Sequence, residues 1–291
     1  MEGSSLGALI KDLRKHMGLT QQELADNICT QAQISKLENG SETPSSFILY
    51  ELSKKLGVDM NYFFEMTSTP RIDYVHDVFD QIRHHINQRE YKEVDQIIHQ
   101  EKHSPLFSAL SSQQFMLWHE AICDFYIRSE PSKSIQKLNI ALTMVQRAKH
   151  YSERQIQIIT SRAIIYNEIE AFERSIELFE EAHFHLKKLI RLKDPLTLSR
   201  ILYGYSKSLS SIGKYDQSIS VCTQGISYTL KHESLYLLGE FFYQKGLNFK
   251  RLGLNTKAIS FFEKARATFN LQNQVEFEEF IRCQIKLLSP D

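Results

Sequence analysis

Side chains that can hydrogen-bond in defined pairs are concentrated just after residue 30 of this 291-residue chain. Gln31 and Gln33 flank Ala32, and Ser35 and Lys36 follow within three residues. A glutamine amide holds a donor beside an acceptor, which matches N6 and N7 of adenine. An alanine methyl can contact that of thymine, and an ammonium group can reach guanine or phosphate. These residue types, all expected to face solvent, predict contacts to the base edges of DNA.

Two short helices joined by a turn must position these side chains. Thr20 and Glu23 have the spacing of a capping box, which predicts the start of one helix. Thr30 predicts the start of a second helix over residues 31–39, and Gly40 its end. Two helices in this arrangement suit a helix-turn-helix, whose second helix lies in the major groove of DNA. We therefore expect the N-terminal residues of the second helix to contact base edges.

The predicted DNA contacts combine base edges with phosphates. Backbone N–H groups at a helix N-terminus favour anions, so polar residues at the start of both helices are expected near phosphates. The predicted set is Thr20, Gln21, Thr30, Gln31, Ala32, Gln33, Ser35, Lys36 and Asn39, with Arg14, Lys15 and Ser41 as further phosphate candidates. The glutamines favour a half-site biased towards A·T base pairs.

Three more helices are expected to complete an N-terminal domain over residues 1–66. Helical spacing of apolar residues predicts a first helix from Leu6 to Gly18, and Pro44 with Ser45 opens a fourth helix. A last short helix follows over residues 59–66. The apolar positions are Leu6, Leu9, Ile10, Leu13, Leu24, Ala25, Ile28, Ile34, Leu37, Phe47, Ile48, Leu49, Leu52, Leu56, Phe63 and Phe64.

Several strings of this domain agree with a known pattern at once. They are GLTQQELA from Gly18, ISKLENG from Ile34, and Pro44. Together they resemble the phage-repressor-like (Cro/C1-type) DNA-binding domain over nearly all of residues 6–64. The resemblance implies a DNA-binding role, and the alternative is a small helical domain without one.

The charge of this domain does not favour DNA. The whole chain has 35 Lys and Arg against 35 Asp and Glu, but residues 1–66 hold six basic and nine acidic residues, a net charge of −3. The other residues hold 29 basic and 26 acidic ones, a net charge of +3. Because phosphate attraction depends on cations at the contact itself, DNA binding is not excluded. We expect one copy to bind weakly, so that a homodimer on two half-sites is needed.

After a polar linker at residues 67–73, residues 74–291 show a repeat of about 40 residues. Small or β-branched residues recur at intervals of 40, 41, 43 and 40 residues, and each is expected to open the second helix of a pair. These repeat positions are Val94, Ser134, Ser175, Ser218 and Ala258. The pattern resembles five degenerate tetratricopeptide repeats with a capping helix near residues 274–288. An irregular helical bundle is the alternative.

Composition agrees with an all-α fold, in which a five-helix helix-turn-helix domain is followed by an α-solenoid. The chain has only 11 Gly and 6 Pro, fewer than a sheet-rich chain with many tight turns would use. No stretch reaches about 18 apolar residues and no signal peptide is recognisable, so we expect a cytoplasmic protein that does not contact a membrane.

Nothing in the sequence predicts a metal, a cofactor or an enzyme. Phosphate-binding, hydrolase and zinc-protease motifs are absent from the sequence, and the acidic strings suit solvated helix faces. We expect Cys29, Cys123, Cys222 and Cys283 to be buried reduced thiols, and His84, His85, His99, His103, His183 and His185 to lie at the surface.

The first helices of solenoid repeats line a concave surface suited to an extended peptide. Amides there can satisfy a peptide backbone, aromatic rings can hold apolar side chains, and cations can bind a carboxylate. The predicted peptide contacts are Arg83, Asn87, Arg89, His119, Tyr126, Gln157, Asn167, Tyr203, Lys207, Tyr243 and Lys250.

The two halves together resemble the peptide-responsive quorum-sensing regulators of Gram-positive bacteria over the full length. The similarity is sharpest in LGALIKDLR from Leu6, in NIC from Asn27 and in QREYKE from Gln88. It implies a homodimer on double-stranded DNA with a two-fold-related operator, in which a short signalling peptide in the groove sets the spacing of the DNA-binding domains. One member of the family has lysines near its peptide where this chain has Asn87 and Arg89, so we expect a different peptide.

Three functions follow from these observations. We expect a transcription regulator, most simply an activator, that a signalling peptide controls. The alternative is a plain helix-turn-helix repressor whose repeats dock a protein partner. An enzyme acting on peptides would need a nucleophile beside a base, and the sequence suggests no such pair.

Overall fold

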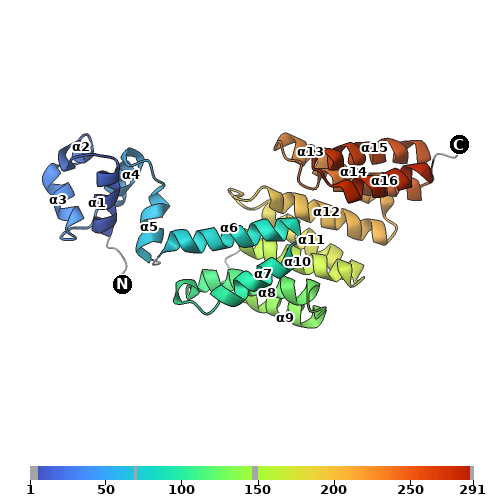
Figure 1. Ribbon diagram of the computed structural model, residues 1–291, viewed down its shortest axis with the longest axis horizontal. Helices are drawn as coiled ribbons and strands as arrows, with labels where there is room; N and C mark the ends of the chain where they lie inside the picture. Colours follow the sequence, from blue (N-terminus) through green and yellow to red (C-terminus); the bar gives the residue numbers. More distant parts are fainter. Residues whose placement is uncertain (1–5, 69–70, 146–149, 289–291) are drawn as a thin grey trace. The chain divides into compact units, whose positions relative to one another are not determined.

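The computed structural model describes residues 6–68, 71–145 and 150–288. Within these ranges the chain forms α-helices and one short 3-10 helix and no strand, which confirms the all-α prediction (Figure 1). The helices form two compact units, Met1–Gln113 and Gln114–Asp291, and each unit is described by itself.

The N-terminal domain of the first unit consists of five short helices around one apolar core. They are α1 (Leu6–His16), α2 (Gln21–Ala25), α3 (Gln31–Glu38), α4 (Ser46–Lys55) and α5 (Met60–Ser68). Capping boxes at Thr20 and Thr30 begin α2 and α3, as predicted, and the Ser45 hydroxyl caps α4. The core contains Leu9, Ile10, Leu24, Ala25, Ile34, Leu37, Leu49, Leu52, Leu56 and Phe63.

Two of the predicted apolar positions lie at the surface instead. Phe47 is 67% exposed and Phe64 is 52% exposed. The helical phase of α4 turns Leu49 and Leu52 inwards, and a residue at the position of Phe47 then faces solvent.

A close approach of two helices holds α3 in place. Gly7 in α1 lies against the carbonyl of Leu37 in α3, so closely that a Cβ atom on Gly7 would overlap that oxygen. The absence of a side chain at Gly7 therefore allows α1 to support α3 directly.

The remainder of the first unit is a helix pair, α6 (Ile72–Gln88) and α7 (Tyr91–Glu101), followed by the 3-10 helix η1 (Pro105–Phe107). Helix α5 continues to Ser68 and α6 begins at Ile72, so both helices extend into the linker predicted at 67–73. Residues 69–70 lie outside the described ranges. Glu101, at a position where the repeat usually has a small residue, accepts a hydrogen bond from Tyr74 Oη at 2.6 Å.

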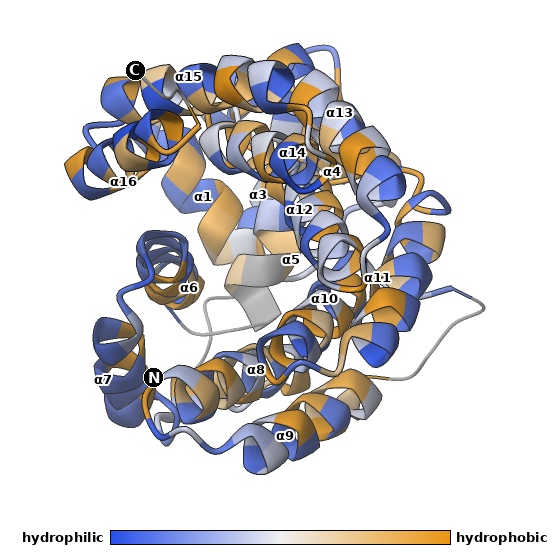
Figure 2. Ribbon diagram, turned by 90° about the vertical axis from the view of Figure 1, so that its right-hand side faces the viewer, coloured by the Kyte–Doolittle hydropathy of each residue, from blue (hydrophilic) through white to orange (hydrophobic). Residues whose placement is uncertain are grey.

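The second unit stacks antiparallel helix pairs one after another, each with a hydrophobic and a hydrophilic side (Figures 1 and 2). The pairs are α8 (Leu110–Tyr126) with α9 (Pro131–Met144), α10 (Glu153–Glu168) with α11 (Phe172–Leu186), α12 (Leu196–Ser211) with α13 (Tyr215–Lys231), and α14 (Leu238–Arg251) with α15 (Asn255–Leu271). The helix α16 (Val275–Lys286) packs on α15, where a capping helix is predicted.

The repeat positions found in the sequence are fully buried in each pair. Val94, Ser134, Ser175, Ser218 and Ala258 all have 0% exposure, as do Ile98, Leu138, Phe179, Cys222 and Phe262 four residues later. The three serines donate hydrogen bonds of 2.6–2.7 Å to the carbonyls of Ala121, Ala163 and Ser206 on the preceding helix. A buried hydroxyl at these positions is therefore satisfied, and it ties the two helices of its pair together.

Buried polar side chains also join one pair to the next. Ser208 of α12 accepts a hydrogen bond from Asn167 of α10 at 2.8 Å and lies 3.0 Å from Ser175 of α11. One repeat later, Asn248 of α14 donates to Ser218 at 2.7 Å and accepts from Ser210. We call these two sets, Asn167–Ser208–Ser175 and Ser210–Asn248–Ser218, the polar triads.

Two expectations about single residue types are partly wrong. Cys123 and Cys222 are buried as predicted, and burial raises the pKa of Cys222 to about 11, but Cys283 is exposed and Cys29 half-buried. His185 is buried, because its ring packs on Tyr151 at a centroid distance of 4.5 Å.

Among the described residues, no helix is both long and apolar enough for a membrane span.

Candidate functional site

The N-terminal end of α3 presents the predicted base-contacting residues unevenly. Gln31, Ala32 and Lys36 are exposed, whereas Ser35 is half-buried. Gln33 is also half-buried, and its side-chain oxygen accepts a hydrogen bond from the backbone N–H of Thr30 at 3.1 Å. The side chain of Gln33 therefore serves the helix cap, and Gln31, Ala32 and Lys36 form the outward surface.

A relay of hydrogen bonds connects this surface with the inside of the domain. Gln31 Nε2 donates to Gln21 Oε1 at 2.7 Å, and Gln21 Nε2 donates to Glu38 Oε2 at 2.9 Å. Glu38 in turn accepts two hydrogen bonds from the guanidinium of Arg14, one of them from Nη2 at 3.0 Å. The relay thus joins residues of α1, α2 and α3.

The ion pair at the inner end of the relay is largely inside the domain. The side chains of Arg14 and Glu38 are 11% and 3% exposed, and Arg14 also donates to the carbonyl of Leu19 at 2.7 Å. Burial alone would raise the pKa of Glu38, but hydrogen bonds from Arg14 and Gln21 and the charge of Arg14 outweigh it and lower that pKa. The prediction of Arg14 as a phosphate contact is wrong, because its guanidinium is held by Glu38.

The other phosphate candidates lie at the surface. Thr20, Thr30, Lys15, Asn39 and Ser41 are exposed, and the Asn39 side-chain oxygen accepts from the backbone N–H of Ser41 at 3.0 Å. Their positions at the ends of α1, α2 and α3 agree with contacts to a DNA backbone.

Two predicted peptide contacts are interior residues. His119 is 1% exposed, and its Nδ1 lies 2.8 Å from the carbonyl of Phe115. Asn167 is 8% exposed and belongs to a polar triad. Both predictions assigned an outward direction to side chains that the packing of α8 and α10 turns inwards, so neither side chain is placed to meet a ligand.

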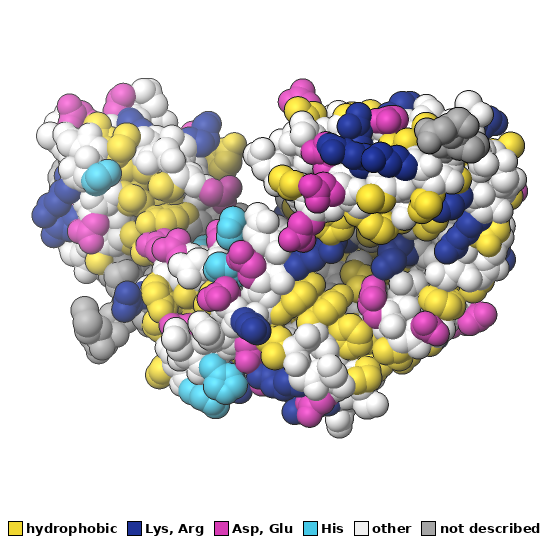
Figure 3. Space-filling model, turned by 45° about the vertical axis from the view of Figure 1, so that its right-hand side comes forward, with side chains coloured by type: hydrophobic (Ala, Val, Ile, Leu, Met, Phe, Trp, Pro, Cys, Tyr) yellow, Lys and Arg dark blue, Asp and Glu magenta, His cyan; other side chains and the backbone are white. Residues whose placement is uncertain are grey.

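Partly exposed candidates remain on the first helices of the other pairs. Gln157 of α10, Tyr203 and Lys207 of α12, and Tyr243 and Lys250 of α14 are half-buried, and Tyr126 at the end of α8 is exposed. Lys207 pairs with Glu168 at 3.0 Å, and Lys250 donates to Gln284 at 3.1 Å. Hydrophobic and Lys or Arg side chains lie next to one another in the right-hand part of Figure 3.

The three candidates of the first unit lie near the end of α6. Arg83 pairs with Asp80 at 2.8 Å on the exposed side of this helix, and Asn87 is half-buried. Arg89 is exposed, in a left-handed conformation with φ of 62° that ends the helix.

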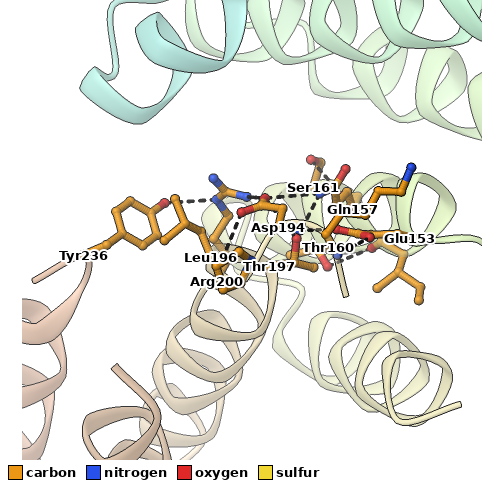
Figure 4. A network of polar contacts seen from close by, with 12 residues as sticks. Glu153, Gln157, Thr160, Ser161, Asp194, Leu196, Thr197, Arg200 and Tyr236 are labelled. Carbon is orange, nitrogen blue, oxygen red and sulfur yellow. Dashed lines mark hydrogen bonds and ion pairs between the residues drawn. The ribbon is translucent and has the colours of Figure 1, made fainter. Parts of the chain in front are cut away.

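Sequence patterns missed the centre of a polar network in the second unit. Asp194 accepts hydrogen bonds from Gln157 Nε2 at 3.2 Å, from Thr197 Oγ1 at 3.2 Å and from Arg200 Nη1 at 3.0 Å (Figure 4). The Nε of Arg200 donates to Tyr236 Oη at 3.0 Å.

This network joins polar side chains of α10 and α12 to two residues in the connections between helices. Asp194 and Tyr236 lie in connections between helices, which a repeat-based pattern does not cover. The signal that could have revealed Asp194 is the Asp-Pro step before α12, because its carboxylate accepts the N–H of Leu196, the first residue of that helix, at 3.0 Å.

Among the described residues, no group of three His, Cys, Asp or Glu side chains is placed to hold a metal ion.

Comparisons with known proteins agree with this arrangement. Residues 10–63 match a family model described as helix-turn-helix, and residues 80–284 match the RNPP family C-terminal domain. A 62-residue stretch is 37% identical to the ImmF control region 10 kDa protein of Bacillus phage phi105 and covers 69% of that protein and 21% of this chain.

Solved structures share the fold over almost the whole chain. PlcR of Bacillus thuringiensis, crystallised with the peptide PapR7 and DNA, matches with a TM-score of 0.87 and 24% identity over 95% of this chain and 98% of its own. ComR of S. thermophilus, in complex with DNA and its signalling peptide ComS, matches with a TM-score of 0.69 and 15% identity over 98% of this chain and 99% of its own. The match of the C-terminal domain model over most of the chain shows that this protein belongs to the RNPP family of peptide-controlled helix-turn-helix transcription regulators.

Proposed function

We propose that this protein is a cytoplasmic transcription activator that binds a two-fold-related operator as a homodimer and responds to a short signalling peptide, without catalytic activity. The observation that carries the DNA-binding part is the exposed end of α3. Gln31, Ala32 and Lys36 point outwards there, on a helix that Gly7 and Glu38 hold against the rest of the domain. This is the geometry that a helix needs in order to enter the major groove.

We place the peptide on the first helices of the repeats. Tyr203 and Tyr243 offer aromatic surface, Lys207 and Lys250 offer cations, and Gln157 offers an amide. Such a mixture suits a short peptide with apolar side chains and a free carboxylate. PlcR is bound to the peptide PapR7 and ComR to its signalling peptide ComS in the structures that this chain resembles, which supports this proposal.

The peptide would act by shifting an existing equilibrium between arrangements of the dimer. Its effect on DNA affinity is limited by the difference between its affinities for the two arrangements. A peptide that binds both arrangements equally well leaves DNA binding unchanged.

A gel-shift experiment tests the proposal. Full-length protein is mixed with its upstream DNA, with and without synthetic peptides from a short secreted precursor encoded beside the gene. We expect one peptide to raise DNA affinity, Gln31→Ala to abolish the shift, and Lys207→Met to weaken only the peptide response. Lys214→Met, at an exposed position between α12 and α13, is the control.

DNA binding that no peptide alters would exclude peptide control, and absence of any sequence-specific shift would exclude DNA recognition by α3.

A further inference from the structure

Asp194 is held in the connection before α12 by contacts on both of its sides. Glu153 of α10 accepts the backbone N–H groups of Lys193 at 2.9 Å and of Asp194 at 2.7 Å. The carboxylate of Asp194 in turn accepts the N–H of Leu196 through Oδ1 at 3.0 Å. These contacts fix the position of the second oxygen, Oδ2, which serves the side chains of the network in Figure 4.

The carboxylate of Asp194 decides which way the amide of Gln157 is turned. Asp194 is paired with Arg200, and an ionised carboxylate can only accept hydrogen bonds. Thr197 Oγ1 therefore donates its hydrogen to Asp194 Oδ2 and has only lone pairs left for Gln157. Gln157 Nε2 donates to Asp194 Oδ2 at 3.2 Å and to Thr197 Oγ1 at 2.9 Å. If the amide were turned round, its Oε1 would face these two acceptors.

Gln157 is left with one hydrogen-bonding group, and that group is an acceptor. Both Nε2 hydrogens are used inside the network, whereas Oε1 has no hydrogen-bond partner within the described part of the chain and is not buried. The charge of Arg200 is balanced by Asp194 at 3.0 Å, so this pair adds no net charge beside the amide. An uncharged acceptor oxygen suits the backbone N–H of a peptide and disfavours a carboxylate.

We infer that Asp194 is a positioning residue of the peptide site, which turns Gln157 so that its Oε1 accepts a backbone N–H of the bound peptide. This inference rests on the proposed peptide binding, and it names the chemistry at one point of contact, which is the main chain of the peptide. The sequence suggests Gln157 as a peptide contact, but it gives no direction for the amide and no role for Asp194.

The test uses the peptide that raises DNA affinity in the gel shift, labelled with a fluorophore, and copies of it with a single N-methyl group on each backbone nitrogen in turn. Fluorescence anisotropy measures their affinities for the full-length protein without DNA. Each N-methyl group removes one hydrogen-bond donor. At the nitrogen that Gln157 contacts, we expect methylation to weaken binding to the wild-type protein about tenfold and to leave binding to Gln157→Met nearly unchanged.

Asp194→Asn tests the positioning itself. The variant replaces one acceptor oxygen of the network by a donor NH2 group at nearly the same size. We expect the effect of methylation at the nitrogen that Gln157 contacts to fall from about tenfold to less than about threefold, with the effects at the other nitrogens kept. Asp216→Asn, which changes an exposed carboxylate in the first turn of α13, is the matched control. Thermal unfolding verifies that the variants fold.

Two results with Asp194→Asn would overturn the inference. One is an unchanged effect of methylation, and the other is an equal loss of affinity for every peptide, which is the result of a purely structural role. A Gln157→Met protein that responds to methylation like the wild type at every nitrogen would overturn it as well, even if Asp194→Asn does not fold. If the wild-type protein binds no peptide, the proposed function fails instead, so the two failures are distinguished.

Discussion

Glu38 joins three helices of the DNA-binding domain through its carboxylate. It is buried, charged and paired with Arg14, and it receives the hydrogen bond of Gln21 as well. Removing one partner of a buried ion pair leaves the other charge unpaired, which is far more costly than losing a surface pair. The same carboxylate therefore contributes to stability and is connected through Gln21 to the surface that we propose to meet DNA.

The lowered pKa of Glu38 predicts how acid affects this domain. A carboxyl whose pKa lies below its ordinary value of 4.5 when folded stabilises the protein fully above that value, and this stability is lost as the pH falls through the folded pKa. We expect Glu38→Gln to destabilise the domain at pH 7 by about 3 kcal/mol and to flatten the loss of stability below pH 4.5. Denaturation of the full-length chain at a series of pH values measures both effects. Glu42→Gln, an exposed position, is the control, and identical pH profiles for the two variants would contradict the prediction.

At the scale of helices, close contacts decide which substitutions are tolerated. Gly7→Ala puts a methyl group against the Leu37 carbonyl. In an ordinary helix this substitution stabilises by up to about 1 kcal/mol, but here we expect a loss of about 2 kcal/mol from overpacking. Denaturation of the wild-type protein and of Gly7→Ala gives the change in the unfolding free energy. A destabilised variant agrees with the close approach of α1 and α3, and a stabilised variant would refute it.

The repeat serines allow a matched comparison. Ser134 and Ser218 both donate to a carbonyl of the preceding helix, but only Ser218 also belongs to a polar triad. Ser218→Ala leaves the Asn248 amide without this acceptor, so we expect a loss of about 3 kcal/mol against about 1 kcal/mol for Ser134→Ala. Equal losses, measured by denaturation, would mean that the triad contributes nothing.

Much of this architecture could be predicted from the sequence, because it follows from local rules. Capping boxes place α2 and α3, and a spacing of about 40 residues locates Ser134, Ser175 and Ser218 in the core. The directions of single side chains in the groove could not be predicted. His119 and Asn167 have the types and spacing of ligand contacts, but their exposure depends on how neighbouring helices pack, which no spacing records.

At the scale of the whole molecule, the uneven distribution of charge has a measurable effect. The net charge of −3 on residues 1–66 leaves few cations for DNA, and Lys15 and Lys36 are the exposed lysines among the predicted contacts. A dimer would use about four such lysines, so we expect log K to fall with log salt with a slope near −4. Fluorescence anisotropy with an operator duplex, measured at several salt concentrations, gives this slope. A slope near −10 would indicate that cations elsewhere on the chain contact the DNA.

The polar triads make the repeat array unevenly stiff. They link α10 and α11 to α12 and then α12 and α13 to α14, so this stretch resists shear between neighbouring helix pairs. At the preceding junction, where α9 packs on α10, the equivalent of Ser208 is Ile165, which has no polar side-chain atom. Other hydrogen bonds cross this junction instead: Trp118 Nε1 donates to Ser161 Oγ at 2.8 Å, and Gln155 Nε2 donates to the carbonyl of Leu142 at 3.2 Å. A strain that a bound ligand places on the C-terminal pairs would therefore meet two triad-linked junctions first and a differently bonded junction at α10 after them.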